Sequence, residues 1–132
     1  MSLTLTNFRA VAMPQTEALH VGADGKLLTA PVPGARIIDC GDAWLSPGWC
    51  DLHVHVWHGG TDISVRASEA GRGTGVTAMA DAGSAGEANF HGLREYVIEP
   101  SAETIRAFLN IGSIGLVACN RVSELIDARS ID

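Results

Sequence analysis

The stretch Pro47–His55 reads PGWCDLHVH and decides how the rest of the chain is interpreted. Its Pro-Gly pair indicates a turn, and the apolar residues that follow predict a buried strand over residues 49–56. His53 and His55 are two residues apart, so both imidazoles point to the same side of that strand. Side-by-side imidazoles can bind one divalent cation. Taken alone, the spacing is equally compatible with two ordinary polar residues that have separate buried partners.

Short apolar runs alternate with helical patterns after this strand. Further strands are predicted over residues 76–80 and 105–111, and helices over residues 64–72 and 89–99, with a last helix around residues 122–126. Ser84 and Glu87 fit a capping box that would begin the second helix. The order strand, helix, strand, helix predicts a parallel α/β arrangement.

Residues 1–45 show a different pattern of apolar residues and contain almost no helix signal. Short apolar runs are separated by turns, of which Asp24-Gly25 is the clearest hairpin signal. We therefore expect two parts: residues 1–45, a small sheet with a structural role, and residues 46–132, which carry the chemistry.

Composition excludes several classes of protein. The chain has 132 residues, of which 46% are hydrophobic, enough for a packed core. Its net charge of −6 disfavours nucleic acid as a partner. The longest uncharged stretch near the end, residues 107–120, is too short and too broken by glycine to span a membrane. No secretory signal is visible, and three cysteines cannot all pair within one chain, so we expect reduced thiols and a cytoplasmic protein.

The segment around the two histidines resembles the start of the barrel in the metal-dependent amidohydrolase superfamily. Members place Asp-x-His-x-His at the end of the first barrel strand, after a Pro-Gly turn, and Pro47, Gly48, Asp51, His53 and His55 match this pattern. Residues 75–86 and the helix over 89–99 resemble the dihydroorotase-like and acyl-amino-acid deacetylase branch. The resemblance implies an α/β fold: the first strands and helices of a TIM-type (β/α)8 metallo-hydrolase barrel, preceded by part of a small β-sandwich.

The same resemblance implies a metal site. His53 and His55 would be ligands of one or two zinc ions, and Asp51 would orient a ligand or a neighbouring strand. The remaining ligands in the family are a lysine and two more histidines, and an aspartate late in the barrel moves the proton. None of these maps onto this chain, whose only lysine, Lys26, precedes the histidine pair. No catalytic acid or base is therefore expected here; it is expected downstream.

Three residues are candidates for substrate contact: two follow predicted strands at the end where barrel sites are built, and the third lies within a predicted strand, where it would face the barrel interior. His58 lies in the loop after the first strand, with a solvated histidine as the alternative. Ser84 follows the second strand, where a helix cap is the stronger interpretation. Asn110 is placed in the third strand, flanked by apolar residues.

The implied reaction is hydrolysis of an amide or ester bond by a metal-activated water. The substrate would be a small acylated amino or hydroxy acid, as in the deacetylases. Dihydroorotases carry an arginine two residues after the second histidine, where it holds the substrate carboxylate, and Trp57 stands there instead. A dihydroorotase is therefore disfavoured.

Chain length leaves other interpretations open. A complete barrel needs roughly 250 residues, so we expect this chain to be incomplete. The alternative is a non-catalytic, truncated barrel fragment that binds metal or mediates association. A third possibility is a fragment that pairs with another chain supplying the missing strands. A homo-oligomer also stays open.

Overall fold

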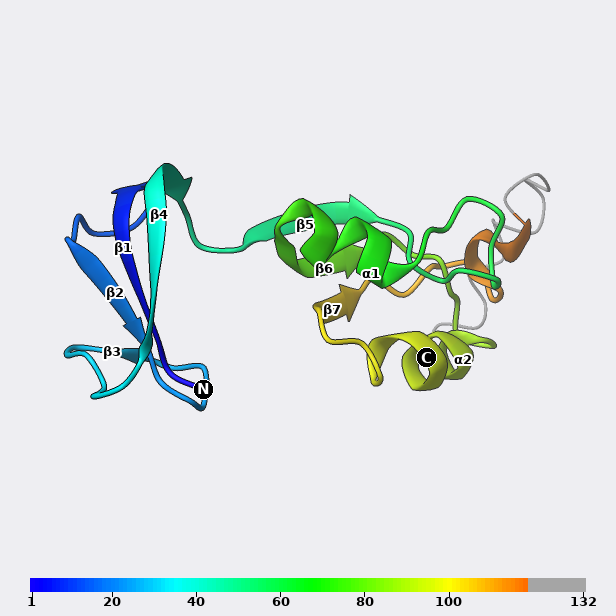
Figure 1. Ribbon diagram of the computed structural model, residues 1–132. Coiled ribbons are helices and arrows are strands. Elements are labelled where there is room, and N and C mark those ends of the chain that lie inside the picture. Colours follow the sequence, from blue (N-terminus) through cyan, green and yellow to red (C-terminus); the bar gives the residue numbers. More distant parts are fainter. Residues whose placement is uncertain (119–132) are drawn as a thin grey trace. The chain divides into compact units, whose positions relative to one another are not determined.

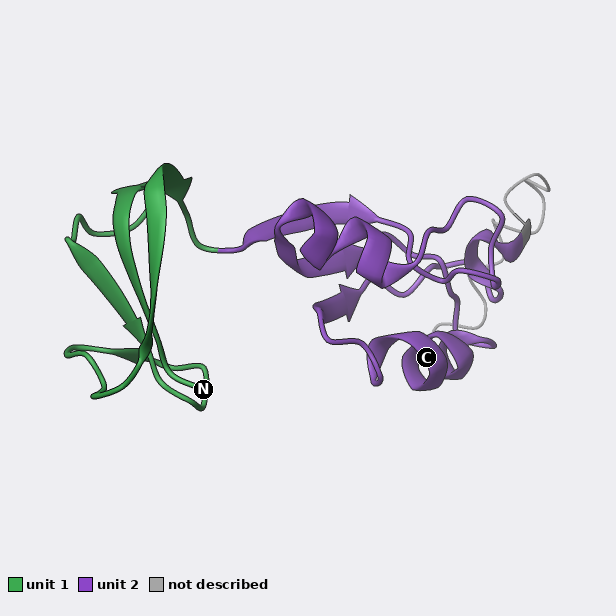
Figure 2. Cartoon of the chain, in the orientation of Figure 1, with its two compact units in different colours: residues 1–47 green, residues 48–132 purple. Residues whose placement is uncertain are grey.

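The computed structural model describes residues 1–118, and the chain divides into two compact units, Met1–Pro47 and Gly48–Asp132 (Figure 2). The boundary expected from the sequence lay two residues earlier. The helix predicted around residues 122–126 and the third cysteine, Cys119, lie outside the described residues.

The first unit is a four-stranded sheet (Figure 1). Its strands are β1 (Leu3–Ala10), β2 (Ala18–Val21), β3 (Leu27–Leu28) and β4 (Arg36–Leu45), in the spatial order β3-β2-β1-β4. Strand β2 runs antiparallel to both β1 and β3, whereas β4 runs parallel to β1. Gly25 lies in the turn between β2 and β3 with a φ of 79°, so the predicted Asp-Gly turn is confirmed.

The second unit is built on a three-stranded parallel sheet in the order β5-β6-β7 (Figure 1). These strands are β5 (Trp49–Val54), β6 (Val76–Asp81) and β7 (Thr104–Ala107). The connection from β5 to β6 holds α1 (Ala67–Ala70) and η1 (Arg72–Thr74), and that from β6 to β7 holds α2 (Phe90–Leu93) and η2 (Arg94–Ile98). A final turn, η3 (Gly115–Ala118), follows β7.

The predicted parallel alternation of strand and helix is thus confirmed, and the differences concern where elements end. Strand β5 ends at Val54 instead of residue 56, and β7 ends at Ala107 instead of residue 111. The predicted first helix is shorter and split, because Gly71 separates α1 from η1. Val56 after β5 is buried, whereas Phe108, Leu109 and Ile111 after β7 are exposed, and periodicity alone does not distinguish either loop from strand.

The core of this unit lies between the sheet and its helices. Val56, Ala67, Met79 and Ile105 are buried together, and Val97 of η2 packs against them. These residues come from the loop just after β5, from α1, from β6 and from β7, so the core joins the sheet to the helical layer. Burying a valine or methionine side chain fully contributes about 1.5–3 kcal/mol, which makes this cluster the main local source of stability.

The expected capping box at Ser84 and Glu87 is wrong. Helix α2 begins at Phe90, with Asn89 as its N-cap. The Asn89 side chain connects two loops: its Oδ1 accepts from Gly86 N at 2.9 Å, and its Nδ2 donates to the carbonyl of Ile114 at 2.9 Å. Ser84 lies too early to cap α2, and its hydroxyl has another partner, described below.

No helix within residues 1–118 is long and apolar enough to cross a membrane.

Candidate functional site

The two predicted metal ligands lie together at the carboxyl end of β5. The ring centroids of His53 and His55 are 5.6 Å apart, and the ring planes are nearly perpendicular, at 86°. His53 is exposed and His55 is half-buried. Asp51, two residues earlier, accepts the backbone N–H of His53 on its Oδ1 at 3.0 Å. Its carboxylate therefore braces the backbone that carries the first imidazole.

A hydrogen-bonded chain leads from His55 into the interior. Nδ1 of His55 is 3.1 Å from Oγ of Ser84, and that hydroxyl donates to Oδ2 of Asp81 at 2.7 Å. Asp81 also accepts the backbone N–H groups of Ser84, at 2.7 Å, and of Val56, at 2.9 Å. Asp81 and Ser84 are both fully buried. The residue predicted as a substrate contact thus lies beneath His55, next to a carboxylate to which the sequence assigned no role.

Asn110 lies three residues beyond β7 instead of within a strand. Its Nδ2 donates to the carbonyl of Gly83 at 2.9 Å, and its Oδ1 accepts from the backbone of Gly112 at 2.8 Å. Both ends of the amide therefore hold backbone, and they join the loop after β6 to the loop after β7. The loop after β6 is the one that carries Ser84.

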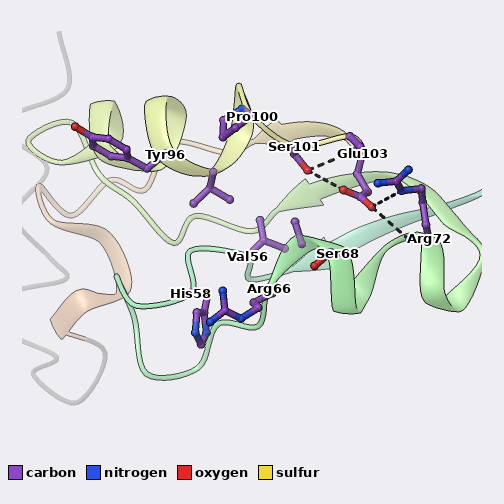
Figure 3. Close-up of a pocket in the computed structure, with 12 residues that line it drawn as sticks. Val56, His58, Arg66, Ser68, Arg72, Tyr96, Pro100, Ser101 and Glu103 are labelled. Atoms are coloured by element: carbon purple, nitrogen blue, oxygen red, sulfur yellow. Dashed lines mark hydrogen bonds and ion pairs between the residues drawn. The ribbon is translucent and has the colours of Figure 1, made fainter.

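His58 lies apart from the histidine pair, in the loop after β5. It lines a pocket of about 390 Å³ together with Arg66, Tyr96 and Glu103 (Figure 3), a pocket that His53 and His55 do not line.

Glu103 is the buried charge of this pocket, with a side chain only 2% exposed. The Ser101 hydroxyl donates to its Oε2 at 2.8 Å, and Nε of Arg72 donates to its Oε1 at 3.2 Å (Figure 3). The hydrogen bond from Ser101 is the largest influence that lowers the pKa of Glu103, with burial acting in the opposite sense. The carboxylate joins η1 to the start of β7, which is a structural task.

Trp57, which stands where the resemblance places an arginine, packs against the loop and α2. A Cβ added to Gly60 would lie 2.3 Å from Cδ2 of the indole, and one added to Gly92 would lie 3.3 Å from its Cζ2. The backbone of Trp57 forms an isolated antiparallel bridge with Arg66. The indole therefore fills space between two elements and provides no charge for a substrate carboxylate.

The histidine pair fits part of a zinc site. Zinc in proteins prefers imidazole, thiolate and carboxylate donors and is commonly four-coordinate. His53 and His55 provide two imidazoles at one strand end, but no group of three histidine, cysteine or acidic side chains within residues 1–118 is arranged to hold a metal ion. A zinc ion held by this pair would need further donors from other residues.

Comparisons with known proteins identify relatives of the whole described chain. No family model matches the sequence. The chain is 59% identical to a deacetylase of Brucella anthropi and 57% identical to a deacetylase of Agrobacterium fabrum, in each case over 98% of its own length. It spans only 35% and 34% of these relatives, about a third.

Two solved structures are also similar to this chain. A crystal structure of a dihydroorotase matches with a TM-score of 0.85 and 55% identity, over 99% of this chain and 37% of that one. An adenine deaminase shares the fold, with a TM-score of 0.71 at 24% identity. The resemblance indicated by the Asp-x-His-x-His segment is confirmed: over nearly its whole length this chain is similar to about a third of two deacetylases and of a dihydroorotase.

Proposed function

We propose that this chain is the N-terminal part of a metal-dependent amidohydrolase of the deacetylase type. The protein would hydrolyse the amide or ester bond of a small acylated amino or hydroxy acid. The observation that carries the proposal is the pair of imidazoles at the end of β5, with ring centroids 5.6 Å apart, in a chain 57–59% identical to two deacetylases.

The open sheet of the second unit supports a barrel completed by further strands. Both β5 and β7 are edge strands, and unpaired edges of a parallel sheet are normally covered. Leu52, in the middle of β5, is 77% exposed, and Phe108, just after β7, is 63% exposed. Such apolar exposure is expected where neighbouring strands and helices of a (β/α)8 barrel are to pack. The strands of the first unit would belong to the accompanying β-sandwich.

His53 and His55 would hold zinc through ring nitrogens. Zinc supplies a Lewis acid for the substrate carbonyl and lowers the pKa of the attacking water. Asp51 braces the backbone at His53, and Ser84 contacts the ring of His55, so each imidazole has its own support. The group that moves the proton would lie beyond residue 132.

Substrate contacts would come from the loops after the three strands. Ser84 and Asn110 already have protein partners for their polar atoms. His58 forms no side-chain hydrogen bond with any residue in the described part of the chain, so its ring is available for a substrate, although the pocket that it lines is not lined by His53 or His55. A dihydroorotase is the second candidate, favoured by the solved structure of that name, but Trp57 offers no carboxylate clamp.

An intact-mass measurement on the purified protein under denaturing conditions decides whether the remaining parts are present. A mass several-fold above 13.8 kDa leaves room for the rest of the barrel. A mass near 13.8 kDa would instead favour the alternative, a truncated fragment that binds metal or mediates association.

Activity and metal content are then measured on the full-length protein. We expect hydrolysis of N-acetylated amino acids or O-acetylated hydroxy acids, loss of activity with a chelator, and recovery with zinc. His53→Gln should abolish activity and lower the zinc content, whereas His91→Gln, an exposed histidine on α2, should change neither. Full activity of His53→Gln with undiminished zinc would overturn the assignment.

A further inference from the structure

We propose that Asp81 and Ser84 are positioning residues for His55, which they hold as the tautomer that has its proton on Nδ1 and a free lone pair on Nε2. The inference rests on the proposed function in one respect: the free Nε2 is the atom that would bind zinc. It adds two residues, one of them expected to cap a helix and the other given no role, to the support of the metal site.

The number of hydrogens on each group determines which atom donates in each bond. A serine hydroxyl has one proton, and the Ser84 hydroxyl donates it to Oδ2 of Asp81 at 2.7 Å. Its oxygen is then only an acceptor toward Nδ1 of His55, 3.1 Å away. The proton in that contact must belong to the imidazole. A neutral imidazole has one N–H, so protonation at Nδ1 leaves Nε2 unprotonated and able to bind a metal.

Asp81 is well suited to impose this direction. Its two oxygens accept three hydrogen bonds, from the Ser84 hydroxyl and from the backbone N–H groups of Ser84 and Val56. The side chain is fully buried, and no lysine, arginine or histidine in residues 1–118 forms an ion pair with it. A buried carboxylate without a cation draws hydrogen-bond donors strongly. The chain of bonds from Asp81 leads outward to His55, where a bound cation would offset the charge.

The backbone around Ser84 is also held from several sides. Gly83 has a φ of 86°, which turns the chain after β6 so that Ser84 N meets Asp81. The carbonyl of Ser84 accepts from Leu116 N at 3.0 Å. A Cβ on Gly115 would lie 2.4 Å from that same carbonyl oxygen, so the two loops are in direct contact. Ser84 is thus fixed before any metal binds, as a positioning residue must be.

The tautomer is tested on the metal-free, full-length protein labelled with ¹⁵N-histidine. Long-range ¹H–¹⁵N spectra distinguish Nδ1–H from Nε2–H. His55→Gln identifies the signals of His55. We expect Nδ1–H in the wild type and a mixture of the two tautomers in Ser84→Ala. Ser68→Ala replaces an exposed serine of α1, and its spectrum should be the same as that of the wild type.

Zinc binding, measured by competition with a chelator, is the second readout. We expect Ser84→Ala and Asp81→Asn to bind zinc about 10- to 100-fold more weakly, the usual cost of removing such support, and Ser68→Ala to bind as the wild type does. The melting temperature of each metal-free variant shows that it is folded. Should Asp81→Asn fail to fold, Ser84→Ala alone carries the test, because it leaves the carboxylate and its backbone bonds in place.

The two proposals fail differently. A wild type that shows Nε2–H at His55, or a folded Ser84→Ala that keeps both the Nδ1–H tautomer and the zinc affinity, would overturn this inference while the metal site stands. A wild type with Nδ1–H that binds no zinc would overturn the proposed function.

Discussion

Gly86 is the position at which one added methyl group should disturb the site most. A Cβ there would lie 1.9 Å from the carbonyl oxygen of Gly112 and 2.5 Å from the carbonyl of Ser113. Both are backbone atoms, so no side-chain rotation relieves the contact. Reaching ordinary van der Waals contact at 3.4 Å from 1.9 Å requires the two loops to separate by about 1.5 Å. Overpacking in a well-packed region lowers the free energy of unfolding by about 1–3 kcal/mol. We expect a loss of about 3 kcal/mol for Gly86→Ala, because the contacted atoms are backbone.

The movement should reach the histidine pair. Gly86 lies two residues from Ser84, and its backbone bridges Asn110 of the opposite loop. A displacement of about 1 Å is enough to break the 3.1 Å contact between Ser84 and His55. Gly86→Ala is therefore expected to weaken zinc binding as well as to lower the melting temperature.

The assay is thermal unfolding of the full-length protein, with Gly73→Ala as the matched control. A Cβ on Gly73 would meet nothing closer than 3.9 Å, and Gly73 has no positive φ. The free energy of unfolding of the control should lie within about 0.5 kcal/mol of the wild-type value. Gly86→Ala should lower the melting temperature by about 5 °C or more. Equal melting temperatures and equal zinc affinities for the two variants would refute the reasoning.

Three further outcomes follow from the contacts. Because the folded-state pKa of Glu103 lies below its ordinary value of 4.5, its contribution to stability is fully present above that value and is lost as the pH falls through the folded-state pKa. Ser101→Ala should therefore lower the melting temperature at pH 7, and its difference from the wild type should shrink in an acid titration followed by circular dichroism. Trp57→Ala should destabilise by about 2 kcal/mol or more in denaturant unfolding, since it empties the space between the loop and α2, and Trp57→Phe should recover part of this. Adding zinc to the chelated wild type should raise its melting temperature, and the rise should be absent in His53→Gln and in His55→Gln, as scanning calorimetry would show.

The alternation of strands and helices, and the place of the two histidines, were predictable from the sequence. Backbone periodicity is a local property, so His53 and His55, two residues apart in a predicted strand, were expected on one side, and their ring centroids lie 5.6 Å apart although β5 ends at Val54. The Asp24-Gly25 turn was predictable for the same reason, since its positive φ is a requirement of the turn itself. The ends of β5 and β7 were not predictable, because apolar residues continue past both strands into loops and have the same composition as strand.

The role of Ser84 was decided only by the tertiary structure. A serine followed three residues later by a glutamate is a valid helix start, and nothing local shows that its hydroxyl has a better acceptor in Asp81. That choice depends on β5 and β6 lying side by side, which brings His55 within 3.1 Å of a residue 29 positions later. Residue types and spacing thus predict the chemistry of a candidate site. The hydrogen bonds that support it join residues distant in sequence, so they exist only once the sheet has formed.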